Sequence, residues 1–106
     1  MPSFRNLQSG DFPAVVVLRG GEKPLGYQQL TVSSSAVALT VPAGAAFALI
    51  NVETDAVRWR DDGTNPTATV GMKVLVDGSL EYDGDLAAIK FIRVTTDAKL
   101  NVSYYG

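Results

Sequence analysis

Short runs in which apolar and polar residues alternate make up most of this 106-residue chain. In the segment Val57-Arg58-Trp59-Arg60, large apolar side chains alternate with arginines, so that the two kinds fall on opposite sides of an extended backbone. This period of two predicts a half-buried strand. No segment shows the 3.6-residue period of an amphipathic helix.

The alternating segment lies within the stretch that organises the chain, residues 45–72. The first part of that stretch, residues 45–52, is an apolar run, which predicts a strand covered on both faces. Turn-forming residues replace any periodic pattern over residues 61–67. Two strands that deliver a polar loop indicate recognition more often than catalysis.

Further strands follow from the same pattern, separated by turns about every eight to twelve residues. They cover residues 14–18, 27–32, 36–41, 71–76, 79–82, 89–94 and 99–105. Asp77-Gly78 predicts a two-residue hairpin turn, and residues 95–98 are expected to close a second hairpin. The chain is therefore predicted to be all-β, a single-domain antiparallel β-sandwich or jelly roll of about eight to nine short strands.

The first thirteen residues have neither a helical nor a strand period, and the predicted domain covers residues 14–106. One interpretation of residues 1–13 is a frayed tail. The other is an extended arm whose Phe4, Leu7 and Phe12 insert into a neighbouring subunit, because such side chains would otherwise be exposed apolar surface.

Composition excludes several function classes. The net charge of −2 comes without a cluster of like charges, so nothing suggests nucleic-acid binding. The chain has no Cys and no His, which removes thiolate chemistry, the commonest general base and the commonest transition-metal ligand. No apolar run approaches the roughly 20 residues of a membrane span, and no signal-like start is seen, so folding in a cytoplasm is expected.

Carboxylates are the remaining candidates for chemistry, and they suggest no enzyme. Asp61-Asp62 and the pair Asp83 and Asp85 do not fit a calcium loop, and Asp beside Gly at a strand end is mostly turn chemistry. Glu53 and Glu81 would need to face each other across a cleft to hydrolyse a glycoside. We therefore predict no catalytic residue, no metal site and no cofactor.

Several residues have alternative interpretations that the sequence leaves open. Trp59, the only tryptophan, fits a core position or a platform for a sugar ring. Tyr105 fits a last strand or an interface patch. Arg58, Arg60 and Arg93 are predicted on strands, opposite the bulkiest apolar residues, where they form a solvated face or pair with carboxylates of another subunit.

A resemblance rests on residues 57–72, which read Arg, aromatic, Arg, then Asp-Gly-Thr-x-Pro-Thr-Ala and a glycine. Together with Phe91-Ile92-Arg93 and the ending Leu100-Asn101-Val102-Ser103-Tyr104-Tyr105, this segment resembles small structural proteins of tailed bacteriophages. The likeness covers about half the chain, within residues 45–105, and leaves the first forty residues unmatched. It implies a β-rich, non-enzymatic, oligomeric virion protein and transfers no catalytic residue.

We therefore expect a virion component of head, neck or tail, made in the cytoplasm of a bacterial host, that binds itself and other virion proteins. The alternative is a small module that binds carbohydrate or another receptor on a host surface. Neither hypothesis involves nucleic acid or membrane. The expected interface residues are Phe4, Leu7, Phe12, Arg58, Arg60, Asp61, Asp62, Arg93 and Tyr105.

Overall fold

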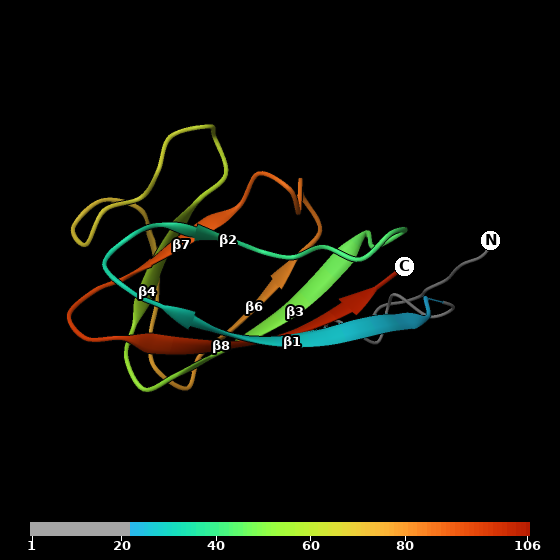
Figure 1. The fold of residues 1–106 in the computed structure, drawn as a ribbon, viewed down its shortest axis with the longest axis horizontal. Helices are drawn as coiled ribbons and strands as arrows, with labels where there is room; N and C mark the ends of the chain where they lie inside the picture. The colour runs from blue at the N-terminus through green and yellow to red at the C-terminus, as the bar shows by residue number, and fades with distance from the viewer. Residues whose placement is uncertain (1–21) are drawn as a thin grey trace, which may run out of the picture.

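The computed structural model describes residues 22–106, and this part of the chain contains eight strands and no helix. The strands are β1 (Pro24–Val32), β2 (Val37–Ala38), β3 (Phe47–Glu53), β4 (Val57–Arg60), β5 (Met72–Val74), β6 (Ser79–Tyr82), β7 (Lys90–Arg93) and β8 (Ala98–Tyr105). They form two four-stranded antiparallel sheets that pack face to face, which confirms the predicted all-β sandwich (Figure 1). The predicted strand at residues 14–18 and the arm at residues 1–13 lie outside the described residues.

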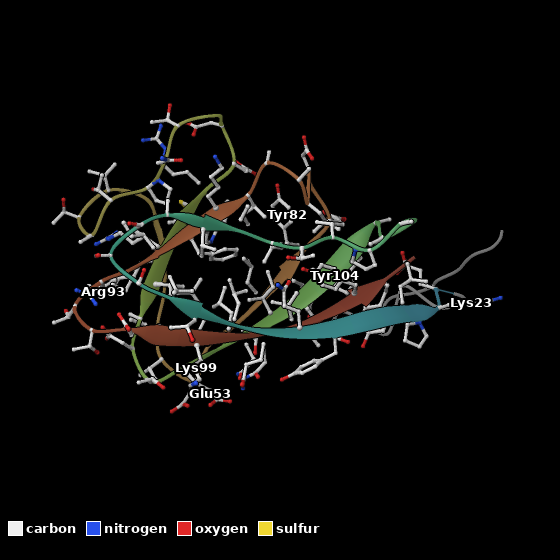
Figure 2. The ribbon with its side chains drawn as sticks, viewed as in Figure 1. Lys23, Glu53, Tyr82, Arg93, Lys99 and Tyr104 are labelled. Atoms are coloured by element: carbon white, nitrogen blue, oxygen red, sulfur yellow. The ribbon has the colours of Figure 1, made fainter. Side chains whose placement is uncertain are left out.

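The core lies between the two sheets and follows the alternation in the sequence. Along β8, Leu100, Val102 and Tyr104 are buried, while Asn101 and Ser103 between them are partly exposed. Figure 2 shows Tyr104 between the two layers. Burial of alternate residues supplies the main stabilisation, at roughly 25 cal/mol for each Å² of apolar surface removed from water.

The prediction that residues 45–52 are covered on both faces is wrong for most of the run. In β3 the inward residues Ala48, Ile50 and Val52 are fully buried. On the outer face Phe47 is also buried, but Leu49 and Asn51 are partly exposed. No third layer covers the outer face of this sheet in the described part of the chain (Figure 1). The apolar run, which includes the polar Asn51, therefore does not distinguish an interior strand of a sandwich from a strand buried on both sides.

The two predicted hairpins are also wrong, although the turns themselves exist. The N–H of Gly78 donates to the carbonyl of Leu75 at 2.9 Å, and Asp77 has a positive φ of 67°. However, β5 pairs with β4 whereas β6 pairs with β3 in the other sheet, and β7 and β8 are likewise in different sheets. Turn residues specify that the chain reverses, but burial of the apolar faces decides which strands pair.

Strand pairing follows a nested order from the ends of the described chain inward. The pairs are β1 with β8, β2 with β7, β3 with β6 and β4 with β5. Pairing of β8 with β3, and of β7 with β4, completes the two sheets. The first sheet has the order β1-β8-β3-β6 and the second sheet has the order β2-β7-β4-β5. Among the connections between these eight strands, only the one from β4 to β5 stays within a sheet.

Two strands are shorter than the sequence pattern predicts. The expected strand at residues 36–41 is reduced to the two residues of β2, and that at residues 71–76 to the three residues of β5. Both lie at the edges of the second sheet, where only one neighbour supplies backbone hydrogen bonds. Within residues 22–106 the model contains no helix of the length and apolar character that crossing a membrane requires.

Candidate functional site

The connection from β4 to β5, residues 61–71, is held in place by Arg58. The Arg58 guanidinium donates from Nε to the carbonyl of Ala68 at 3.1 Å and from Nη1 to that of Gly71 at 2.9 Å. Gly71 has a φ of 142°, and a Cβ there would approach the Cβ of Arg58 and of Pro66 at 3.1 and 3.2 Å. Glycine is thus required where the loop returns to the sheet.

A second arginine fastens the start of the same loop. Arg60 donates from Nε and Nη2 to the two carboxylate oxygens of Asp62, at 3.0 and 2.5 Å. These hydrogen bonds lower the pKa of Asp62 and raise that of Arg60. Asp62 also accepts the N–H of Thr64 at 3.3 Å, which is a local turn contact. The predicted polar loop is therefore a fixed element with two arginine anchors.

An open groove of about 570 Å³ lies where the loop meets the second sheet. We call it the Trp59 groove. Its lining residues are Trp59, Arg60, Asp61, Asp62, Val70, Gly71 and Met72. Trp59 packs its ring edge-on against Tyr82 of the opposite sheet, with centroids 5.8 Å apart. Trp59 thus belongs both to the margin of the core and to a surface groove, so both interpretations of this residue apply in part.

Met72 is an inward-facing residue that the first sheet does not cover. Trp59 lies directly across from Phe91 on one side and from Met72 on the other, so the three share the inner face of the sheet. Along this row the exposed fraction rises from 0% at Phe91 to 60% at Met72. The inner face of the second sheet therefore continues beyond the core and ends in uncovered apolar surface.

The chain around Met72 adds more apolar surface of the same kind. Val70, Leu75 and Val76 are 51%, 63% and 46% exposed. We call residues 70–76 the apolar edge, because they include the edge strand β5 and its flanks. Lys73, at the middle of β5, faces the other way, across from Arg58. The apolar edge continues directly into the Trp59 groove, since Val70 and Met72 line both.

Asp61 connects the groove to the core. Its carboxylate accepts the hydroxyl of Tyr82 at 2.6 Å, and the Tyr82 side chain is almost fully buried. The pKa of Tyr82 is raised to about 12, mainly by burial and to a smaller extent by this hydrogen bond to a carboxylate. The hydroxyl therefore stays protonated at neutral pH, when it acts as a donor to Asp61.

The structure brings four of the predicted interface residues together and places Arg93 and Tyr105 elsewhere. Arg58 and Arg60 lie on β4 at the base of the loop, and Asp61 and Asp62 begin it. Arg93 lies across from Val57, which is fully buried, so its prediction on the face opposite the apolar residues is wrong. At the end of β7, the Arg93 guanidinium donates to the carboxylate of Asp97 at 2.5 Å.

Tyr105 is remote from the groove, on the outer face of the first sheet. Its ring lies 5.8 Å from that of Phe47, and its hydroxyl accepts that of Ser103 at 3.3 Å. Arg58, Arg60 and Arg93 all have partners within their own chain, and pairing with another subunit stays a prediction. Phe4, Leu7 and Phe12 lie outside the described residues.

Nothing in the described residues assembles the carboxylates into a reactive site. Glu53 and Glu81 lie on paired strands, but Glu81 is across from Leu49, four positions from Glu53, and Glu53 accepts the amide of Asn101. Within residues 22–106 no group of three acidic, His or Cys side chains could hold a metal ion.

Sequence reasoning missed the apolar edge. The sequence pattern predicts a strand over residues 71–76 but does not show that Met72, Leu75 and Val76 are exposed. Only Val74 is partly buried against the core. The sequence does carry a usable signal, however, because Val70, Leu75 and Val76 add apolar residues on both sides of a strand that begins directly after Gly71.

No protein-family model, curated protein or solved structure matches this chain.

Proposed function

We propose that this protein is a non-enzymatic structural component of a bacteriophage virion, a head decoration, neck or tail accessory protein that assembles with itself and attaches to the particle. The observation that carries the proposal is the apolar edge beside the Trp59 groove. A continuous exposed apolar surface on a small protein marks an interaction site. The segment that resembles phage structural proteins, residues 57–72, is also the one that builds the groove.

The strand order supports the jelly roll as the form of the sandwich. In a jelly roll, one long hairpin folds over itself, so that the first strand pairs with the last, the second with the seventh, and so on inward. The nested pairs of this chain agree with that scheme. Jelly rolls occur in viral capsid and lectin domains, which is compatible with both functions considered for this chain.

The side chains of the surface favour a protein partner. Tryptophan, methionine and arginine are enriched in protein interfaces, and Trp59, Met72 and Arg60 all line the groove. Edge strands in stable monomers are usually protected by charge or by cover. Lys73 protects the outer face of β5, whereas the inner face at Met72 has no such protection.

The test is the solution mass of the full chain, measured by light scattering on a sizing column across a dilution series. We expect a closed oligomer, and we expect Met72→Glu or Leu75→Glu to weaken it about tenfold or more, because a carboxylate would be buried at the interface. Lys73→Glu is the matched control on the same strand and should leave the mass unchanged. A chain that stays monomeric in every variant would contradict self-assembly through the apolar edge.

Carbohydrate binding is the second candidate, and one observation favours it. The Trp59 groove combines an aromatic wall with the carboxylates of Asp61 and Asp62, the residue types that stack on a sugar ring and accept its hydroxyls. Since Trp59 is the only tryptophan, its fluorescence reports on the groove directly. Quenching by surface glycans, lost in Asp61→Asn, would support this function; emission that glycans leave unchanged would count against it.

A further inference from the structure

We propose that the Trp59 groove of one copy binds the N-terminal arm, residues 1–13, of a second copy, with Phe4 as the apolar anchor and Arg5 paired with Asp61. This inference rests on the proposed self-assembly and names the partner of the same surface. The groove offers an open apolar wall, and the arm contains isolated large apolar side chains at Phe4, Leu7 and Phe12. An aromatic anchor in a pocket is the usual centre of an interface.

The position of the unfilled surface shows what kind of side chain fits there. Met72 lies at the end of the row that begins with buried Phe91 and continues through Trp59, so the next occupant would extend an existing core. Such a place favours an aromatic or aliphatic side chain over a polar one. An aromatic residue beside Trp59 would also gain a ring–ring contact, beyond the apolar area that it buries.

Charge selects Phe4 over Phe12 as the anchor. Arg60 is paired with Asp62 through two hydrogen bonds, whereas Asp61 accepts only the neutral hydroxyl of Tyr82 from the described residues. The groove therefore carries a net negative charge with Asp61 as its unbalanced carboxylate. Phe4 is followed by Arg5, which would balance it, whereas Phe12 follows Asp11, which would be repelled.

The groove and the start of the described chain lie at opposite ends of the molecule, which suits an arm that comes from a second copy. Lys23, ten residues after the end of the arm, lies at the end away from β4 and from Arg93 (Figures 1 and 2). The described residues extend 44 Å along their longest axis. In an extended chain, at about 3.3–3.6 Å per residue, the nineteen residues from Lys23 back to Phe4 would span this length, so the assignment to a second copy rests on the proposed self-assembly. In a head-to-tail arrangement, each copy gives one arm and receives one, and such contacts form a ring where the rotation between copies closes and a filament where it does not.

The decisive experiment mixes two full-length variants. Phe4→Ser removes the anchor and keeps the groove, while Met72→Glu blocks the groove and keeps the arm. Each variant alone should be monomeric where the wild-type chain is oligomeric, with an affinity about tenfold or more weaker. The mixture should form a dimer and nothing larger, since only one arm and one groove are competent. Phe12→Ser is the matched arm control and should keep the wild-type mass.

A peptide of residues 1–13 gives a second readout that does not depend on the mass. Added to the Phe4→Ser chain, it should shift the emission of Trp59, and the same peptide with Phe4→Ser should not. Arg5→Glu in the peptide should weaken binding about tenfold, because it would place a carboxylate beside Asp61. Arg5→Glu in the full chain should weaken assembly likewise, whereas Arg19→Glu, outside the arm, should not.

The outcomes separate this inference from the proposed function. If Met72→Glu dissociates the oligomer but Phe4→Ser does not, the arm is not the occupant, although self-assembly through the apolar edge stands. If the mixture of variants stays monomeric, or the peptide leaves Trp59 unchanged up to about 1 mM, the inference is overturned. A wild-type monomer whose stability falls with Phe4→Ser at every concentration would place the arm in its own groove, which also overturns it.

Discussion

The longest strands of this sandwich belong to its first sheet. We relate this difference in strand length to stability in the first sheet and to recognition in the second. In the first sheet β1 and β8 have nine and eight residues, whereas strands β2, β4, β5 and β7 of the second have two to four. Long strands align many inward side chains and backbone hydrogen bonds. The second sheet has fewer of both, and it devotes residues 61–71 to a loop that arginines hold in place.

The uncovered surfaces of the two sheets also differ. On the outer face of the first sheet, Asn101 accepts Tyr27 and Gln29 at 2.6 and 2.9 Å and donates to Asn51 and Glu53 at 3.2 and 2.6 Å. Polar groups that satisfy one another need no partner beyond water. The apolar edge of the second sheet has no such arrangement. We infer that the first sheet is the scaffold and that the second presents the binding surface.

The largest expected effect is on the scaffold. Ile50→Ala, at a fully buried position of β3, should lower the free energy of unfolding by about 2–5 kcal/mol, because it removes apolar contacts and leaves a cavity. Leu49→Ala, one position along the same strand and partly exposed, should cost roughly 1 kcal/mol or less. Urea denaturation checks both values. Equal losses would mean that the outer face of this sheet is also covered in solution.

A smaller effect is expected where the loop is anchored. Arg58→Ala removes two charge-assisted hydrogen bonds to loop carbonyls and should cost about 1.5–3 kcal/mol. Hydrogen exchange should accelerate over residues 61–71 and leave β8 protected. Lys73→Ala, across from Arg58 and exposed, is the matched control. If exchange in the loop does not change, something other than Arg58 keeps it ordered.

The smallest effect concerns the contact between the two sheets at Tyr82. Tyr82→Phe removes the hydroxyl bonded to the Asp61 carboxylate and should cost about 1.5 kcal/mol at neutral pH, the low end for a hydrogen bond to a charged group, because Asp61 is exposed to water. The exposed Tyr27→Phe, which also removes a hydroxyl bonded to a side chain, should cost less. Chemical denaturation at neutral pH measures both differences.

The stabilisation that Tyr82 provides depends on pH in the alkaline range. The pKa of Tyr82 in the folded chain, about 12, is above its ordinary value of 10.0, so the unfolded state loses this proton first. The stabilisation is therefore fully present below about pH 10 and is lost as the pH rises towards 12. Tyr82→Phe should remove that part of the alkaline loss, as followed by melting temperature and tyrosinate absorbance. A part remains, because burial also raises the pKa of Tyr104.

Local sequence predicted much of the scaffold and little of the site. Alternation identified strands at the positions of β4, β6 and β8, because a period of two records which side of a strand is buried. It could not show that the Arg58 guanidinium reaches back to Ala68 and Gly71, since side-chain contacts across a loop leave no periodic trace. It also grouped Arg93 with Arg58, although the register places them on opposite faces.

The amino-acid sequence by itself determined the fold class, the approximate positions of the strands and turns, and the absence of Cys and His chemistry, because these depend on residue type and short-range period. Only the tertiary structure decided which strands pair and where the core ends. Asp77-Gly78 reverses the chain in any fold, but whether β6 then pairs with β5 or with β3 depends on which arrangement buries the apolar faces of distant strands. The exposure of Met72 results from that global choice, since its row of inward residues extends beyond the sheet that covers it.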